Sequence, residues 1–265
     1  MVDIDSILTD LHTENTLIDA IVRDLEPSSW SLPTPAVGWT IAHQIAHLHW
    51  TDAMSLLAID RPDDFDLERD RQLADPDHYV DDAATDFLGT DPAELLARWT
   101  GTREALAARL AELDPTTSIP WYGPPMRPAS MATARLMETW AHGQDITDTL
   151  GLAHPAGPGL RQIAHLGVRT RDFSFRIHGQ HVPTDEIYVE LTAPDGSLWR
   201  WGDPTATNSV TGPAEDFCLL VTQRRHRDDL ALTARGAIAH QWMSVAQAFA
   251  GKATSGRAPL RPVTS

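Results

Sequence analysis

The sequence predicts an α+β protein, in which an up-down bundle of four helices is followed by a smaller mixed α/β domain. Apolar residues recur with helical spacing in four long stretches of the N-terminal part. After a Pro/Gly-rich link over residues 154–159, the pattern changes to the alternation that is typical of strands. We expect the bundle to span residues 1–153, the second domain residues 154–255, and a disordered tail residues 256–265.

The first two helices are predicted from their apolar residues. Residues 3–25 place Ile, Leu and Val at intervals of three and four, which is the pattern of an amphipathic helix. After a turn-rich connector, Thr40 is a suitable N-cap for a second helix that runs to about Ile59. Residues 60–90 are strongly acidic and poor in apolar residues, so we expect a surface excursion with a short helix near its end.

Proline, glycine and capping residues set the limits of the next two helices. Asp91 is predicted to cap a helix that begins with Pro92 and continues through a Leu/Ala-rich pattern. The prolines of residues 120–128 exclude a helix from that segment. A fourth helix is then expected, with Ser130 as its N-cap and Gly151 at its C-terminal end.

The second domain is predicted to combine helices with a small sheet. Residues 160–178 are expected to form one helix. Residues 186–201 alternate apolar and polar side chains on both sides of PDGS, which indicates a β-hairpin. A strand followed by a helix that starts near Pro213 is expected next, and the apolar stretch 237–251 closes the domain.

The composition excludes several classes of partner. With 37 acidic and 21 basic residues, the chain has a formal net charge of −16, which repels nucleic-acid phosphates and anionic membranes. No apolar run approaches the ~18 residues of a membrane span, and the first residues lack the features of a signal peptide. The single cysteine, Cys218, excludes an intramolecular disulfide. We therefore expect a cytoplasmic protein that acts on a small molecule; a homodimer is a candidate assembly, and the oligomeric state stays open.

Histidines and a carboxylate at one-turn spacing mark the second and fourth predicted helices. His43 and His47 are four residues apart on the second helix, and Glu138 and His142 are four apart on the fourth. Each pair therefore shares a helix face. Facing helices that present Glu and His inward build metal sites in helix bundles, and three such ligands with one open position are typical of catalytic zinc. From spacing alone, a solvated Glu beside a boundary His is the competing interpretation.

The segments GWTIAHQIAHL and RLMETWAHGQD resemble the DinB-like superfamily, and more narrowly the N-terminal domain of mycothiol-dependent maleylpyruvate isomerases. The family pattern joins Trp-Ser/Thr and a later His with Arg-x-x-Glu-x-x-x-His-x-x-Asp. The matching residues here are Trp39, Thr40, His47, Arg135, Glu138, His142 and Asp145. The resemblance implies a divalent metal, usually zinc, with His47, Glu138 and His142 as ligands. After residue 155 it is weaker, but Arg224 lies near the family's recurring C-terminal arginine, so the resemblance makes it a candidate catalytic residue.

Other residues near the expected metal each have two interpretations. His43 is a candidate to support a ligand or to contact substrate. Asp145 either orients a ligand imidazole or is a helix-surface acid, and Arg135 either pairs with a carboxylate or binds an anionic substrate. Trp121 and Tyr122 either wall a cofactor pocket beside the metal or pack as a cap.

The resemblance implies thiol chemistry at the metal. A cation stabilises a bound thiolate, so the thiol loses its proton near neutral pH and no protein cysteine is needed. We expect a mycothiol-dependent isomerase or S-transferase with zinc as the metal and mycothiol as co-substrate, acting on a small electrophile. A metal-dependent hydrolase that uses metal-bound hydroxide and a non-catalytic metal-binding module remain the alternatives. Residues 60–90 and the loop before the fourth helix depart from typical maleylpyruvate isomerases, so the substrate stays open.

Overall fold

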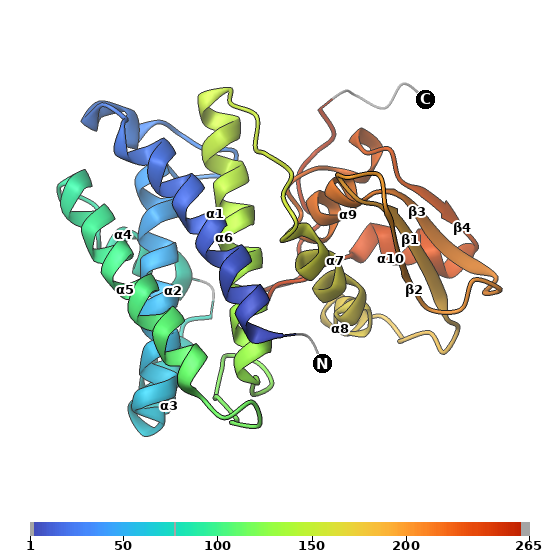
Figure 1. The fold of residues 1–265 in the computed structure, drawn as a ribbon, viewed down its shortest axis with the longest axis horizontal. Helices are drawn as coiled ribbons and strands as arrows, with labels where there is room; N and C mark the ends of the chain where they lie inside the picture. Colours follow the sequence, from blue (N-terminus) through green and yellow to red (C-terminus); the bar gives the residue numbers. More distant parts are fainter. Residues whose placement is uncertain (1–2, 77, 261–265) are drawn as a thin grey trace. The chain divides into compact units, whose positions relative to one another are not determined.

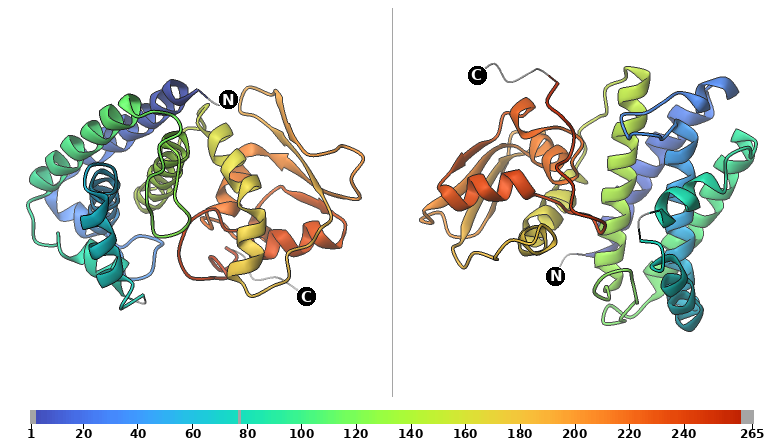
Figure 2. Two further views of the ribbon diagram at one scale, coloured as in Figure 1. Left: turned by 90° about the horizontal axis from the view of Figure 1, so that it is seen from below. Right: turned by 180° about the vertical axis from the view of Figure 1, so that it is seen from behind.

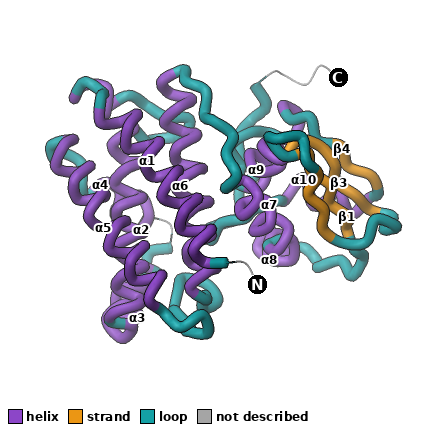
Figure 3. Tube along the Cα trace, viewed as in Figure 1, coloured by secondary structure: helices purple, strands orange, loops and turns teal. Residues whose placement is uncertain are grey.

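The computed structural model describes residues 3–76 and 78–260. By its internal contacts, the chain divides into two units, Met1–His154 and Pro155–Ser265. Within the described residues, the first unit is built from helices, and the second combines helices with a four-stranded sheet (Figure 3). The predicted α+β class, a helix bundle followed by a smaller mixed domain, is confirmed.

Four long helices form the bundle: α1 (Ile4–Arg23), α2 (Ile41–Asp60), α5 (Pro92–Glu112) and α6 (Pro128–Leu150) (Figure 1). Helices α1 and α2 both pack against α5 and α6, and Figure 2 shows the same neighbours from two further directions. A short 3-10 helix, η1 (Pro27–Ser31), follows α1. Two apolar clusters fill the bundle, and among their fully buried members are Ile18, Ile45, Trp99, Ile7, Phe65 and Met131. Burial of these side chains is the main source of the bundle's stability.

The ends of the bundle helices mostly follow the predicted signals. Asp91 accepts hydrogen bonds from two N–H groups in the first turn of α5, and Gly151 ends α6 in the left-handed conformation at φ 66°. The prediction that Ser130 caps the fourth helix is wrong. That helix begins at Pro128, whose fixed φ suits the first turn and whose missing N–H needs no partner there.

The acidic segment contains more helix than the sequence predicted. Two helices occupy it, α3 (Pro62–Gln72) and α4 (Tyr79–Thr85), so the surface excursion with one short helix is wrong. Phe65, fully buried, anchors α3 in the apolar core of the bundle. Acidic residues in the first turn of α3 and basic residues in its last turn complement the helix dipole. A helix with one buried apolar residue shows no clear 3.6-residue pattern, which is why periodicity missed it.

The sheet of the second unit has the strand order β2-β1-β3-β4. Its strands are β1 (Ile187–Thr192), β2 (Leu198–Trp201), β3 (Asn208–Pro213) and β4 (Thr233–Arg235). Strands β1 and β2 pair antiparallel, which confirms the predicted hairpin, and β1 pairs with β3 in parallel. Helix α9 (Ala214–Val221) follows β3 directly, as predicted, and buries Cys218 completely.

The prediction of one helix over residues 160–178 is wrong, because the helix is interrupted at Thr170. The structure has α7 (Leu160–Arg169) and α8 (Arg171–Ile177) instead. The Thr170 hydroxyl donates to the carbonyls of Leu166 and Gly167, but Thr51 and Thr147 make the same bonds inside unbroken helices, so these bonds do not explain the break. Elements that complete the unit are η2 (Arg227–Asp229) and α10 (Ala237–Val245).

The expected tail is described in part. Residues 256–260 belong to the described chain, and there the Leu260 N–H donates to the Asp229 carboxylate at 2.9 Å. Residues 261–265 lie outside the described residues, so the disorder expected for them stays a prediction. In the part of the chain that the structure describes, no helix has the length and apolarity to cross a bilayer.

Candidate metal centre

Helices α2 and α6 bring together three residues that the sequence analysis selected. One ligand atom each of His47, Glu138 and His142 lies within 4.8 Å of the others. Glu138 Oε2 is 3.6 Å from His47 Nε2 and 3.1 Å from His142 Nε2. Within residues 3–76 and 78–260, no other group of three His, Cys or acidic side chains shows this spacing. These three residues are the candidate ligands, and together they are called the metal cluster.

Burial and charge are balanced at Glu138. The Glu138 side chain is 22% exposed to solvent, while the two histidine side chains are about 10% exposed. Burial acts to raise the pKa of Glu138, but the hydrogen bonds and charges of His142 and His47 outweigh it and hold the pKa well below its ordinary value. The cluster therefore contains an ionised carboxylate, which is the form that binds a cation.

A chain of hydrogen bonds decides which nitrogen of His142 carries a proton. The Thr34 hydroxyl donates to the Trp39 carbonyl at 3.0 Å, so it accepts from Gln44 Nε2, at 2.9 Å. This leaves Gln44 Oε1 facing His142 Nδ1 at 2.5 Å. Because an amide oxygen can only accept, His142 is protonated on Nδ1. Its other nitrogen, Nε2, is the one that faces Glu138.

This arrangement fits a metal ion. When His142 is neutral with its proton on Nδ1, its Nε2 lone pair and the Glu138 carboxylate are both acceptors, so at 3.1 Å a proton or a cation lies between them. His47 adds a third N/O donor, and its Nδ1 is buried without a hydrogen-bond partner among the described residues. Two imidazoles and one carboxylate are a donor set that zinc accepts in catalytic sites. The residues present therefore fit a divalent cation, and zinc as its identity stays a prediction.

Two tryptophans flank the cluster. The Trp39 ring centroid lies 5.3 Å from that of His47 and 5.9 Å from that of His142, with an interplanar angle of 20° to the latter. The Trp50 ring lies 5.7 Å from His47. These rings place apolar surface beside both imidazoles, and less polar surroundings strengthen electrostatic interactions.

His43 is engaged at the start of α2. Its Nδ1 accepts a hydrogen bond from the Thr40 backbone N–H at 3.1 Å, and the two residues form a capping box. The imidazole also stacks on Trp39, with ring centroids 6.0 Å apart. Burial lowers the pKa of His43, although the nearby Asp81 carboxylate acts to raise it. The supporting or substrate-contacting role expected for His43 stays a prediction.

The other two polar residues predicted on α6 are buried. Arg135 Nε donates to Asp52 Oδ1 at 2.8 Å, and the Trp99 indole N–H donates to the second oxygen of Asp52. This is the carboxylate pairing that the sequence left open for Arg135, in a side chain only 2% exposed. Asp145 is 1% exposed, so the interpretation as a helix-surface acid is wrong. Its proposed role in orienting a ligand stays a prediction.

The two aromatic residues of the loop before α6 pack against α3. Trp121 stacks on Phe65 with ring centroids 5.8 Å apart, and the Tyr122 hydroxyl donates to the side-chain oxygen of Gln72. Burial raises the pKa of Tyr122. These contacts support the packing interpretation of the loop. Arg224 belongs to the second unit, where its guanidinium donates to a backbone carbonyl. A cofactor role for the loop and a catalytic role for Arg224 remain predictions.

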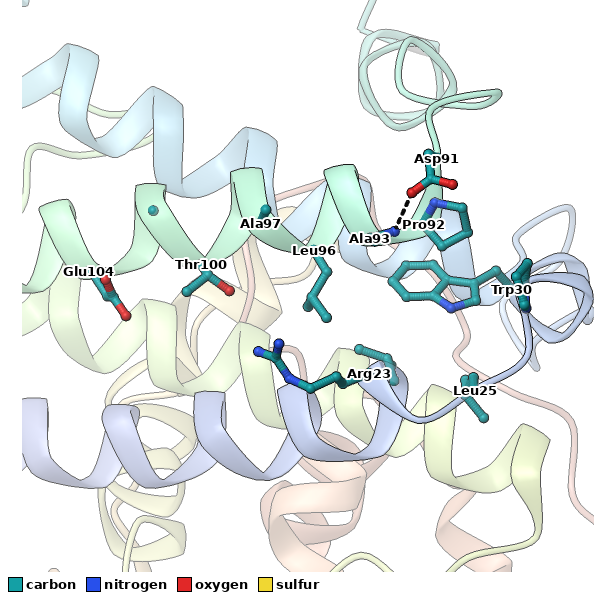
Figure 4. A pocket seen from close by; sticks show the side chains of 13 residues that line it. Arg23, Leu25, Trp30, Asp91, Pro92, Ala93, Leu96, Ala97, Thr100 and Glu104 are labelled. Carbon is teal, nitrogen blue, oxygen red and sulfur yellow. Dashed lines mark hydrogen bonds between the residues drawn. The ribbon is translucent and has the colours of Figure 1, made fainter.

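Two of the surface cavities formed by described residues of the first unit lie outside the cluster. One of about 530 Å³ is bounded by α1, η1 and α5, where Leu96 and Trp30 face Arg23 (Figure 4). The other, of about 710 Å³, is bounded by α2, α3 and α4 and has Trp50 and Tyr79 in its wall. The three cluster residues line neither cavity.

Gln44 and Thr34 were missed by the sequence analysis. Gln44 lies three residues before His47, so it shares the same helix face, and a polar residue on that face was the available signal. Gln44 is completely buried. Thr34 reaches Gln44 only through the fold of the connector before α2, which no spacing rule predicts.

The bundle and its cluster define a DinB-like helix-bundle protein. More narrowly, the chain belongs to the mycothiol maleylpyruvate isomerase N-terminal domain family, whose model matches residues 11–147. A second family model, described as wyosine base formation, matches residues 183–235. The resemblance found in the sequence is therefore confirmed.

Similar proteins include one full-length relative. An uncharacterised protein of Mycobacterium tuberculosis, present in strains CDC 1551 and H37Rv, is 48% identical over 97% of this chain and 100% of its own length. The solved structure of the mycothiol-dependent maleylpyruvate isomerase matches with a TM-score of 0.58 at 14% identity, over 88% of this chain and 93% of that one. A histidine-to-alanine mutant of that isomerase matches with a TM-score of 0.59 at 13% identity and the same coverage. At these identities the solved structures show the fold alone.

Proposed function

We propose that this protein is a divalent-metal-dependent enzyme that uses a low-molecular-weight thiol, such as mycothiol, to attack a small electrophile. It acts either as an isomerase, in which the thiol adds to an activated double bond and leaves after rotation, or as an S-transferase, in which the thiol stays on the product. The observation that carries the proposal is the cluster of His47, Glu138 and His142 in a bundle of this family.

In this proposal the metal activates the thiol, and residues of the protein set the charge and the surroundings of the metal. A divalent cation, with zinc as the expected ion, lowers the pKa of a thiol that approaches it. Glu138 supplies the negative charge of the site. Gln44 keeps the proton of His142 on Nδ1, and the flanking Trp39 and Trp50 limit the access of water.

The chain has no suitable thiol of its own. Cys218 is completely buried in α9, and burial raises the pKa of its thiol well above the ordinary value. It is the single cysteine of the sequence. An external thiol is therefore the expected nucleophile, and such a co-substrate agrees with the cytoplasmic location expected from the sequence.

Turnover with and without thiol tests this function. The zinc-loaded protein is incubated with a panel of activated alkenes and alkyl halides, in the presence or absence of mycothiol. We expect product only when mycothiol is present. Glu138→Gln removes the charged ligand and should abolish turnover, whereas Cys218→Ser should leave it unchanged. Hydrolysis without thiol would contradict the proposal in favour of a hydrolase, and bound metal without any turnover would favour a binding module.

A further inference from the structure

Helix α4 contacts both tryptophans that flank the cluster. The Trp39 indole Nε1 donates a hydrogen bond to Asp81 Oδ1 at 2.8 Å, although 42 residues separate the two along the chain. At the start of α4, the Tyr79 ring packs edge-on against Trp50, with centroids 6.1 Å apart. The acidic segment, expected only at the surface, therefore forms part of the surroundings of His47.

Trp39 is fixed at two points. Its carbonyl accepts hydrogen bonds from the Thr34 backbone N–H at 2.8 Å and from the Thr34 hydroxyl at 3.0 Å, which hold its backbone. Its indole has only two rotatable side-chain bonds, and the bond to Asp81 restrains both. The ring is thereby kept nearly parallel to the His142 imidazole and close to the His47 imidazole.

We propose that Asp81 is a positioning residue of the metal centre, which acts through Trp39 to keep the indole stacked on His142 and tilted beside His47. This inference depends on one part of the proposed function, namely that the cluster binds a cation. No contact described above joins Asp81 to His47 or His142; Asp81 bonds the Trp39 indole and acts on the pKa of His43, which stacks on the same ring. With the ring in place, water reaches the two ligands less easily, and a bound cation leaves more slowly.

The neighbouring residue offers a matched control. Asp82 has the same side chain on the same helix, but it lines the cavity between α2, α3 and α4. Among the described residues, the carboxylate that accepts the Trp39 N–H is that of Asp81. A change at Asp82 therefore alters the charge of α4 by the same amount and leaves the indole bond in place.

The test compares Asp81→Ala, Asp81→Asn and Asp82→Ala in the full chain loaded with Co²⁺. The measurements are the rate of metal transfer to a chelating dye, the Co²⁺ absorption spectrum and the thermal unfolding of the metal-free protein. Asp81→Ala should release Co²⁺ about tenfold faster and should alter the Co²⁺ spectrum. An effect of about tenfold is the lower end of the loss in metal affinity when a residue that supports a metal ligand is changed. Asp81→Asn keeps an oxygen acceptor for the indole, so its release rate should stay within about twofold of the unchanged chain.

Each other outcome overturns the proposal in an identifiable way. Equal release rates in Asp81→Ala and Asp82→Ala would show that the indole bond has no role. A defect in Asp81→Asn as large as in Asp81→Ala would assign the effect to charge. If Asp81→Ala does not fold, Trp39→Phe removes the N–H and must show the same faster release. Absence of metal binding in the unchanged chain would overturn this inference, while tight binding without thiol-dependent turnover would overturn the proposed function alone.

Discussion

Gln44 on α2 accepts a hydrogen bond from His142 Nδ1 on α6 at 2.5 Å, although 98 residues separate them in sequence. This contact joins the two helices that carry the metal cluster. It also leaves Nε2 as the nitrogen of His142 that can act as a ligand. The properties of the cluster therefore depend on a residue that is not itself a ligand.

The first prediction concerns Gln44. Replacing it with Met keeps the length of the side chain but removes the acceptor, so His142 is free to change tautomer and orientation. We expect metal affinity to fall by about 10- to 100-fold, the usual cost of losing a ligand's hydrogen-bond partner. Gln44→Glu retains an acceptor and serves as the control. Competition with a chelating dye measures both affinities, and equal affinities for Gln44→Met and the unchanged chain would refute this role.

The second prediction separates two histidines that lie one turn apart. His47→Ala should abolish metal binding, because it removes one of three ligand atoms that lie within 4.8 Å of one another. His43→Ala should retain the metal and lose only its part of the capping box, at a cost of about 1 kcal/mol in stability. Elemental analysis of the purified variants decides the matter. Full metal content in His47→Ala, or none in His43→Ala, would mean that the wrong histidine was chosen.

The third prediction concerns the buried pair of Arg135 and Asp52. Arg135→Met leaves the Asp52 carboxylate buried without its guanidinium, so the free energy of unfolding should fall by about 3–5 kcal/mol. Arg135→Met combined with Asp52→Leu removes both charges and should cost less than the single change. Urea unfolding of the metal-free proteins measures these differences. A loss below about 1 kcal/mol in the single variant would show that the pair contributes little.

The fourth prediction is a pH dependence of stability. Burial acts to raise the pKa of Asp19, but hydrogen bonds from Arg23 and Arg103 outweigh it and lower the pKa. A carboxyl whose pKa is lower in the folded state stabilises the fold above its unfolded pKa, about 4, and loses that contribution as the pH falls through the folded value. Asp19→Asn should therefore be less stable at neutral pH and should lose less stability on acidification. Parallel slopes for both proteins below about pH 4 would contradict this.

The ligand cluster could be predicted from sequence for physical reasons. Glu138 and His142 lie one helical turn apart, and the chain between α2 and α6 is long enough to bring His47 opposite them. The family resemblance selected His47 over His43. Capping residues such as Asp91, and Gly151 at the end of α6, were visible because their effects are local.

Contacts made by tertiary packing could not be predicted in this way. The partner of Asp81 is an indole brought to it by the connector before α2, and the partner of Gln44 lies on another helix. Helix α3 depends on one buried ring, Phe65. None of these produces a periodic pattern. The residues that surround the candidate ligands, such as Gln44 and Asp81, could therefore be identified only from the folded structure.

The central claim is that a metal held by His47, Glu138 and His142 binds and activates an external thiol, and an absorption spectrum of the Co²⁺-loaded protein tests it most directly. On addition of mycothiol, we predict a new sulfur-to-cobalt charge-transfer band that saturates at one thiol per bound metal. The band should be absent from His47→Ala and present in Cys218→Ser. A protein that binds Co²⁺ tightly but shows no such band at saturating mycothiol would contradict the account.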